Sequence, residues 1–331
     1  MKQTEIVVLI LAAFCDYLIG DPPNLIHPVQ VMGWIINKYT KISSSLVTKR
    51  SLGRILGIIL GISLIGGSAI ITWLIIFACY YLHPYLGYAI EIILLASCFA
   101  LKSLRQAAED VLEAINQQNL ALARTKLSFY VGRDTENLSQ SEIYRAVLET
   151  VAENATDGVT SPLFYAILGA LIPGVGAAPL SMAYKAASTL DSMVGYRQAP
   201  YEHLGWFSAQ LEDRLTWLPC RLTVLTLSLL AGKPRQIWAL CRRDANLDPS
   251  PNSGWSECVY AGILGVQLGG INYYQGVKKV KPLLGDALQP ITALSIKQAL
   301  NLTRYCFLLW LTIGIAVYYF IFAIKIPAEA G

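Results

Sequence analysis

Residues 55–82 read ILGIILGISLIGGSAIITWLIIFACYYL, and no charged side chain interrupts them. An α-helix rises about 1.5 Å per residue, so about 20 apolar residues cross a hydrocarbon core of roughly 30 Å. Residues 305–324 form a second uncharged stretch of this kind. Both stretches predict membrane-spanning helices, and the rest of the chain has to be compatible with them.

The composition agrees with a membrane protein. Of the 331 residues, 54% are hydrophobic and only 15% are charged, whereas soluble domains carry about 25% charged residues. The net charge of +4 is modest, and no basic stripe with interleaved aromatics is present, so no nucleic-acid partner is expected. Seven scattered cysteines without a C-x-x-C pair, and only three histidines, predict neither a tightly bound metal nor a disulfide.

Four further apolar stretches are less regular. Residues 5–20 and 85–101 are marginal spans because each contains an acid, Asp16 or Glu91. The first is expected to be a retained helix, since no A-x-A-like cleavage site follows it. Residues 161–182 are interrupted by Pro-Gly and residues 215–230 are short, so both are expected to be buried or re-entrant.

The fold expected from these patterns is an all-α, multi-pass integral membrane protein, a single membrane-embedded domain over residues 1–331. No internal repeat and no β-rich segment is evident. Lys and Arg residues concentrate before the second span and after the third, which predicts that the site lies on the cytoplasmic side with both termini outside. The segments expected to be cytoplasmic, and to form the site from helices and loops, are 21–54, 102–160, 183–214 and 232–303.

The stretch VLETVAENATDG places Glu149, Glu153 and Asp157 four residues apart. Ser139 and Glu142 form a capping-box pattern that would start this helix. Carboxylates at this spacing share one helical stripe and repel one another. A phosphate-bound Mg²⁺ would remove the repulsion, because this ion prefers carboxylate oxygens. The alternative is a solvated acidic face, helped by Arg145 one turn earlier.

The stretch TLDSMVGYR, residues 189–197, follows Lys185. Asp191 and Ser192 suit a polar pocket, and Lys185 and Arg197 could balance the charge of a phosphate. The alternative is a helix that simply ends at a glycine cap. By pattern alone the two interpretations are equally good.

Three loop-like stretches complete the polar part of the chain. Residues 244–257, DANLDPSPNSGWSE, are dense in turn-forming residues and predict a loop that covers a site. Residues 268–276, LGGINYYQG, contain paired glycines that would let the backbone approach a ligand, but they lack the spacing of a Walker loop. Residues 20–28, GDPPNLIHP, predict a rigid turn with an acid and an imidazole.

At these same residues the sequence resembles the cobalamin biosynthesis CobD/CbiB family. The resemblance covers roughly residues 16–276 and keeps the family's order of motifs. The matching stretches are DYLIGDPPNLIHPV, YVGRDT, ETVAENATDGVTSPLFY, TLDSMVGYR, LEDRLTWLPCRLT, SPNSGWSE and LGGINYYQG.

The resemblance implies an adenosylcobinamide-phosphate synthase that is a multi-pass protein of the plasma or inner membrane. Such an enzyme uses ATP, with Mg²⁺, to join adenosylcobyric acid to 1-amino-2-propanol phosphate or ethanolamine phosphate. The residues assigned to catalysis are Glu149, Glu153, Asp157, Asp191, Asp213 and Glu257, of which Glu149, Glu153 and Asp157 are the expected Mg²⁺ ligands. The residues assigned to substrate binding are Asp21, His27, Arg133, Asp134, Asn154, Lys185, Ser192, Arg197, Asn252, Gly254 and Asn272.

Within this scheme, Asp213 or Glu257 would take the proton of the amine, and Arg133, Lys185 and Arg197 would hold the amino-alcohol phosphate. The chain departs from the family pattern at Ser188, Thr216, Leu247 and Asp248, which puts ligand details in doubt. The expected partners are the corrinoid, the amino-alcohol phosphate and the lipid bilayer. A homo-oligomer, and association with the enzymes that later add the nucleotide loop, stay open.

Two alternatives without catalysis belong to other classes of membrane protein. A transporter would place its acids at mid-membrane in inverted repeats, whereas the acids here fall in polar segments. A membrane sensor related to β-lactamase induction would need no catalytic acids.

Overall fold

The structure is a computed structural model that describes residues 4–21, 27–44, 50–196, 198 and 201–323. The chain is mostly helical, as predicted, and it divides into two compact units where the sequence suggested one domain. The first unit comprises residues 1–100, 161–215 and 308–331, and the second comprises residues 101–160 and 216–307.

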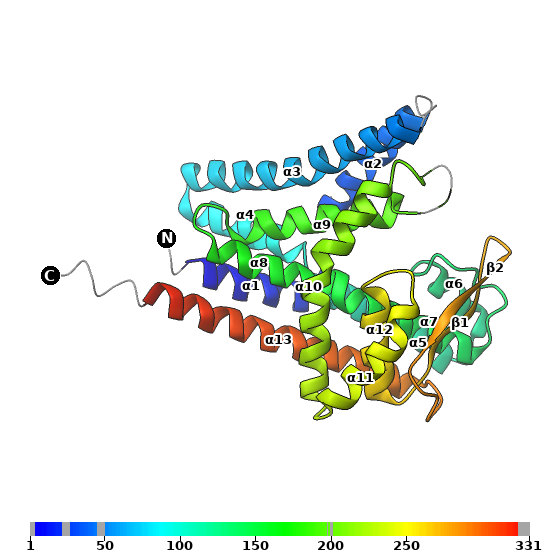
Figure 1. Ribbon diagram of the computed structural model, residues 1–331. Helices are drawn as coiled ribbons and strands as arrows, with labels where there is room; N and C mark the ends of the chain where they lie inside the picture. Colours follow the sequence, from blue (N-terminus) through cyan, green and yellow to red (C-terminus); the bar gives the residue numbers. More distant parts are fainter. Residues whose placement is uncertain (1–3, 22–26, 45–49, 197, 199–200, 324–331) are drawn as a thin grey trace. The chain divides into compact units, whose positions relative to one another are not determined.

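The first unit is built from long apolar helices (Figure 1). Helix α9 is central to it, since it contacts α2, α3, α4 and α8, while α1 packs against α4. The helices of this unit are α1 (Thr4–Leu18), α2 (Pro28–Ser44), α3 (Arg50–Leu82), α4 (Pro84–Ala96), α8 (Ser161–Leu171), α9 (Ala177–Val194), the start of α10 (Trp206–Leu230) and the end of α13 (Ala293–Ala323).

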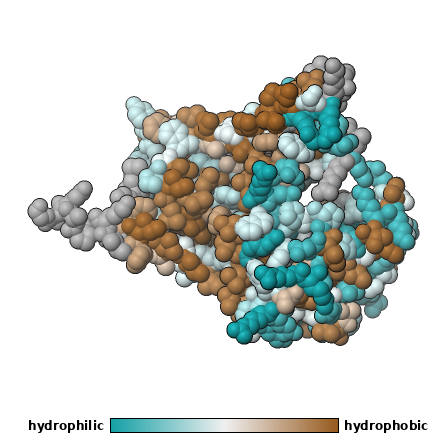
Figure 2. All heavy atoms as spheres, in the orientation of Figure 1, coloured by the Kyte–Doolittle hydropathy of each residue, from teal (hydrophilic) through white to brown (hydrophobic). Residues whose placement is uncertain are grey.

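Two helices of the described chain, α3 and α13, are long and apolar enough to cross a membrane. Helices α4 and α5 are long and apolar enough to cross a membrane only when they are counted together as one span with a bend. In α3 only 28% of the most apolar window is buried, so most of its large side chains face outward. Figure 2 shows hydrophobic residues gathered over the apolar helices of the first unit. Two or three apolar helices of this length fit a membrane protein.

The weaker spans differ from their predicted limits. Helix α1 has only 15 residues, and α4 ends at Ala96 rather than at residue 101. The stretch 161–182 is broken between α8 and α9, where Pro173 and Gly174 lie. The stretch 215–230 is not a separate segment, because α10 begins at Trp206 and continues through Pro219.

The second unit combines shorter helices with a β-hairpin. Helix α7 lies at its centre and contacts α5, α6, α12 and strand β1. The elements are α5 (Leu101–Asn116), α6 (Leu120–Ser128), α7 (Gln140–Asn154), the π-helix η1 (Ala155–Thr160), the end of α10, α11 (Pro234–Asp244), the 3₁₀-helix η2 (Ala245–Leu247), α12 (Ser253–Leu264), β1 (Leu268–Tyr274), β2 (Val277–Leu284) and the start of α13.

The hairpin is a correction to the all-α prediction. Strands β1 and β2 pair antiparallel, and Tyr274 lies opposite Val277 across a two-residue turn, Gln275-Gly276. Both turn residues have positive φ, +53° and +76°. A two-residue turn with these angles has a twist that matches the right-handed twist of the two strands that it joins. Residues 268–276 were expected to be a ligand-facing loop, but they form most of the hairpin.

Candidate functional site

The candidate site of the second unit begins with the capping box that starts α7. The Ser139 side chain accepts a hydrogen bond from the Glu142 amide, and the Ser139 amide donates to Glu142 Oε2 at 2.8 Å. The helix then buries Ile143, Val147 and Val151, which lie on its apolar face. This arrangement confirms the predicted helix start. It also carries Glu149, only 1% exposed, into the interior of the unit.

Glu149 is held by two arginines and one backbone amide. Arg133 Nη2 lies 2.5 Å from Glu149 Oε2, Arg145 Nη1 lies 3.4 Å from Oε1, and the Gly269 amide donates to Oε1 at 2.9 Å. A buried carboxylate is tolerated only when opposite charge and hydrogen bonds replace its lost hydration. Both oxygens of Glu149 are therefore already engaged by the protein itself.

Arg145 also fastens the hairpin to α7. Its guanidinium donates to the carbonyl oxygens of Gly269 and Ile271, the latter at 2.9 Å. Gly269 has a φ of +85°, and a Cβ at this position would overlap the Pro282 carbonyl oxygen. Gly269 therefore serves close backbone packing within the hairpin, where its carbonyl meets Arg145.

Asn272 has one satisfied and one unsatisfied polar atom. Its Oδ1 accepts from Arg133 Nη1 at 2.9 Å and from Arg145 Nη2 at 3.1 Å, which fixes the orientation of the amide. Its Nδ2 is buried without a hydrogen-bond partner among the described residues. A buried donor left in this way costs about 1–3 kcal/mol, so it marks a place where a ligand acceptor would be stabilised.

A second unsatisfied atom lies on α12. Glu257 is fully buried, and its Oε1 lies 3.1 Å from Lys281 Nζ on strand β2. Glu257 Oε2 has no partner in the described chain. Lys281 lies directly opposite Gly270 in the hairpin, and Asn272 lies two residues from Gly270 on β1. Opposite positions, and positions two apart on one strand, are on the same face of a sheet, so Asn272 and Lys281 share one face of the hairpin.

The surroundings of Glu257 alter its acidity. Burial raises the pKa of its carboxyl to about 8; the Lys281 ammonium opposes this rise, and the carboxylates of Glu153 and Glu149 add to it. Burial by itself lowers the pKa of Lys281, but attraction by the same carboxylates outweighs burial and raises it. A carboxyl group with a pKa near neutral pH can both accept and release a proton, as general acid–base chemistry requires.

The expected three-carboxylate magnesium site does not fit this geometry. Among the described residues, no three Asp, Glu, His or Cys side chains are grouped closely enough to hold a metal ion. Glu149 gives both oxygens to cations and an amide, and the α-helix changes to the π-helix η1 after Asn154, so Asp157 leaves the regular stripe. Magnesium binding by Glu149, Glu153 and Asp157 stays a prediction.

Asp134 and the loop 244–257 have structural partners. Asp134 accepts from the amides of Gln275 and Gly276, at 2.8 and 2.7 Å, and so anchors the hairpin turn. Arg221 donates to Asn252 Oδ1 at 3.3 Å and to the Pro251 carbonyl at 2.9 Å. The stretch expected to cover a site is thus pinned to α10.

Two further residues shape that loop. The Cβ that Gly254 lacks would meet the Ala245 carbonyl. Asp248, one of the departures from the family pattern, accepts from the Ser250 amide at 2.8 Å and from the Ser253 hydroxyl at 3.1 Å. Asp248 therefore forms a turn of its own within the loop.

Six of the predicted site residues belong to the first unit, namely Asp21, His27, Lys185, Asp191, Ser192 and Asp213. His27 Nε2 lies 3.1 Å from Asp21 Oδ1. Helix α9 ends at Val194, and the Gly195 amide donates to the Asp191 carbonyl, so the stretch 189–195 forms a helix end with a glycine cap. Arg197 lies outside the described residues.

The remaining predicted residues belong to the second unit. Arg133, Glu149 and Asn272 form one hydrogen-bonded group, and Glu257 interacts electrostatically with both Glu149 and Glu153. Asn154 is exposed and donates to the Thr150 carbonyl at 2.9 Å. Sequence reasoning missed Lys281 and the clamping role of Arg145. The signal for Lys281 was the Gln-Gly turn between LGGINYY and VKKVKPLL, which indicates a hairpin and places that lysine on its inner face.

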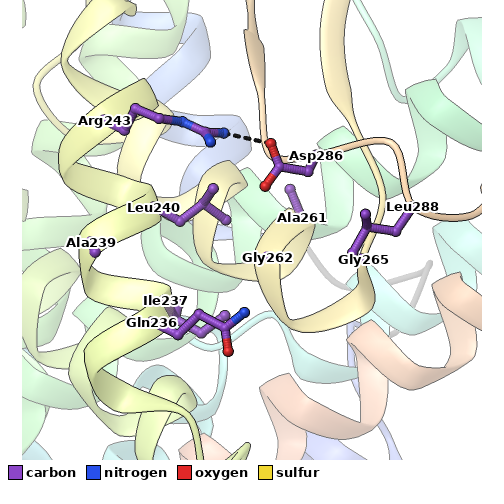
Figure 3. Close-up of a pocket in the computed structure, with 10 residues that line it drawn as sticks. All are labelled: Gln236, Ile237, Ala239, Leu240, Arg243, Ala261, Gly262, Gly265, Asp286 and Leu288. Carbon is purple, nitrogen blue, oxygen red and sulfur yellow. Dashed lines mark hydrogen bonds and ion pairs between the residues drawn. The ribbon is translucent and has the colours of Figure 1, made fainter.

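The second unit also contains a pocket of about 290 Å³ lined by α11, α12 and the segment after β2. Figure 3 shows Arg243 and Asp286 joined at its rim above Leu240 and Gly262. The Arg243 guanidinium donates to Asp286 at 2.8 Å and to both oxygens of Asp244. Because these charges satisfy one another, the buried group around Glu149 and Glu257 is the better candidate for a reaction site.

The chain was compared with known proteins. The family model described as CobD/Cbib protein matches residues 9–303. A "Cobalamin biosynthesis protein CobD" from Synechocystis sp. is 56% identical over 314 residues, 94% of this chain and 92% of the relative. A protein of the same description from Halalkalibacterium halodurans is 39% identical over 94% of this chain and 97% of its own length. A "Cobalamin biosynthesis protein CbiB" from Salmonella typhi is 38% identical over 95% of each. No solved structure matches.

Proposed function

The chain belongs to the CobD/Cbib protein family, and from this premise we propose that it is a membrane enzyme of cobalamin biosynthesis. More specifically, we propose that it uses ATP to join adenosylcobyric acid to 1-amino-2-propanol phosphate or to ethanolamine phosphate. The printed names of the relatives support the pathway. The amide-forming reaction rests on the resemblance and on the chemistry of the site.

An amide does not form directly from a carboxylate and an amine, so the carboxylate has to be activated. In the proposed reaction the γ-phosphoryl group of ATP is transferred to the corrinoid carboxylate, which gives an acyl phosphate and ADP. The amine nitrogen then attacks the acyl carbon, and the bond to phosphate breaks with release of inorganic phosphate. The nitrogen loses one proton, which a base of the protein must accept.

Glu257 is the residue we assign as that base. The observation that carries this assignment is its buried carboxyl group, with Oε1 beside Lys281 and Oε2 without a partner in the described chain. Its raised pKa, about 8, lies near the pH at which a base works well. The unsatisfied Nδ2 of Asn272 is the donor we assign to an oxygen of the substrate.

Two consequences follow for the other assigned residues. Arg133 is only 7% exposed and is occupied by Glu149 and Asn272, so it acts here as a support for the site. Lys185 and Arg197 stay predicted contacts of the amino-alcohol phosphate. Because Glu257 Oε2 has no solvent contact in the structure, the substrate reaches it only if neighbouring groups other than Lys281 move locally.

The test is product formation by detergent-purified protein. Protein incubated with adenosylcobyric acid, ATP, Mg²⁺ and either amino-alcohol phosphate is expected to give the amide, detected by mass. Glu257→Gln is expected to reduce the rate by about 10²–10⁴-fold, whereas the same change at the exposed Glu136 leaves it unchanged. Absence of product from wild-type protein that binds all substrates would instead favour a transporter or a sensor.

A further inference from the structure

Lys281 occupies an unusual position for a lysine on a strand of a hairpin. Its neighbours Lys278 and Lys279 are exposed to solvent, whereas the Lys281 side chain is only 28% exposed. It faces α12, where its Nζ lies 3.1 Å from Glu257 Oε1. Ordering a lysine in this way loses side-chain freedom and part of its hydration, so the contact must be stabilised by the charges around it.

The charges facing Glu257 come from two elements besides α12. Helix α7 contributes the carboxylates of Glu149 and Glu153, and the hairpin contributes the Lys281 ammonium. Arg133 and Arg145 also lie in this region, but both donate to Glu149. Among the described residues, Lys281 is therefore the cation that pairs directly with Glu257.

We propose, on the basis of the function proposed above, that Lys281 is a positioning residue that holds Glu257 by one oxygen and keeps it able to lose its proton. The hydrogen bond to Oε1 directs the second oxygen, Oε2, toward the substrate amine. The positive charge stabilises the ionised carboxylate against burial and against the repulsion of Glu149 and Glu153. Without Lys281, burial and the two neighbouring carboxylates would keep Glu257 protonated up to a higher pH, so a smaller fraction of it could act as a base at any given pH.

The direction of the effect on pH dependence follows from these charges. Burial, Glu149 and Glu153 raise the pKa of Glu257, and Lys281 lowers it. Replacing Lys281 by Met therefore raises this pKa further, and the deprotonated fraction of Glu257 falls at every pH below it. The ascending limb of kcat/KM against pH is expected to move to higher pH by one unit or more, so the rate near pH 7 falls about tenfold or more.

The experiment measures pH–rate profiles of the full-length protein in detergent for wild type, Lys281→Met, Lys281→Arg and Lys279→Met. Lys279 lies two residues away on the same strand and is exposed, so Lys279→Met is the matched control. We expect an upward shift of the limb in Lys281→Met, recovery of the wild-type limb in Lys281→Arg and no change in the control. An equal loss of rate at all pH values in Lys281→Met would overturn the proposal, because it would indicate a merely structural role.

A second measurement does not depend on turnover. The carbonyl stretch of a protonated carboxyl group, taken as the infrared difference between wild type and Glu257→Gln, reports the titration midpoint of Glu257. This midpoint is expected to rise in Lys281→Met and to stay in place in Lys281→Arg. A midpoint that does not move would refute the inference, whatever the activity. If wild-type protein makes no amide but the Glu257 midpoint still rises in Lys281→Met, the proposed function is overturned and the coupling of the two residues stands.

Discussion

Removal of the Arg145 guanidinium, by the substitution Arg145→Met, is expected to release the hairpin from α7. The side chain makes hydrogen bonds with Glu149, Gly269, Ile271 and Asn272. Methionine keeps most of the apolar length of arginine but supplies no donor. The substitution therefore tests the polar contacts with little change in packing volume.

The size of the effect follows from burial. The Arg145 side chain is 14% exposed and that of Glu149 is 1% exposed, so solvent screens their attraction only weakly. Glu149 keeps Arg133 and the Gly269 amide, so the loss is that of charge-assisted hydrogen bonds from Arg145, about 1.5–3 kcal/mol. Since about 1.4 kcal/mol changes an equilibrium constant tenfold, the open population of the hairpin should increase by about 10–100-fold.

Hydrogen exchange of the amides in residues 268–284 is the appropriate assay, because it reports local opening. The matched control is Arg105→Met in α5. Arg105 and Glu109 also stand four residues apart, but their side chains are 33% and 60% exposed and their charged atoms are 4.0 Å apart. Exposed pairs of this kind contribute about 0.3–0.5 kcal/mol, so exchange in α5 should rise by less than about threefold.

The reasoning would be wrong if Arg145→Met changed hairpin exchange no more than Arg105→Met changes exchange in α5. That result would mean that solvent, or a neighbouring cation, replaces Arg145 at Glu149 without measurable cost. A global rise in exchange across both units would also contradict it, because the structure places every bond of Arg145 within the second unit.

Two further predictions concern the hairpin and the membrane. Gly269→Ala places a side chain on a backbone with φ of +85° and against the Pro282 carbonyl. It should therefore lower the free energy of unfolding by about 1–2 kcal/mol or more, and with it Tm. Gly132→Ala, with open space around the new side chain, should leave Tm unchanged. For the orientation expected from the sequence, a membrane-impermeant maleimide should label Tyr81→Cys on intact cells, since Tyr81 is 86% exposed near the end of α3. Lys278→Cys should be labelled only after permeabilisation, and the opposite pattern would reverse the orientation.

Local features of the chain were predictable from the sequence. The helix over residues 55–82 follows from an uninterrupted apolar run, and the start of α7 follows from Ser139 and Glu142, three residues apart. These properties depend on neighbours within one or two turns, so they can be recognised without knowledge of the fold. The ordered motifs likewise indicated the family, which the comparisons confirmed.

The change of α7 into a π-helix was not predictable in this way. The i, i+4 spacing of Glu149, Glu153 and Asp157 implies one stripe only if the helix stays regular. Buried hydroxyl pairs accompany the irregular turn: Thr156 lies 2.6 Å from Ser256, and Thr160 lies 2.7 Å from Thr223. These partners stand 63 or more residues away in the chain, so spacing alone could not reveal them.

By itself, the sequence determined the helical class, the apolar spans and the family, because apolar length, capping and motif order are properties of contiguous residues. Only the tertiary structure decided which charges meet. Arg145 reaches Gly269 across 124 positions of the chain, and Lys281 meets Glu257 only because a hairpin turns back against α12. Electrostatic attraction depends on distance and burial in space, and neither quantity follows from the order of residues along the chain.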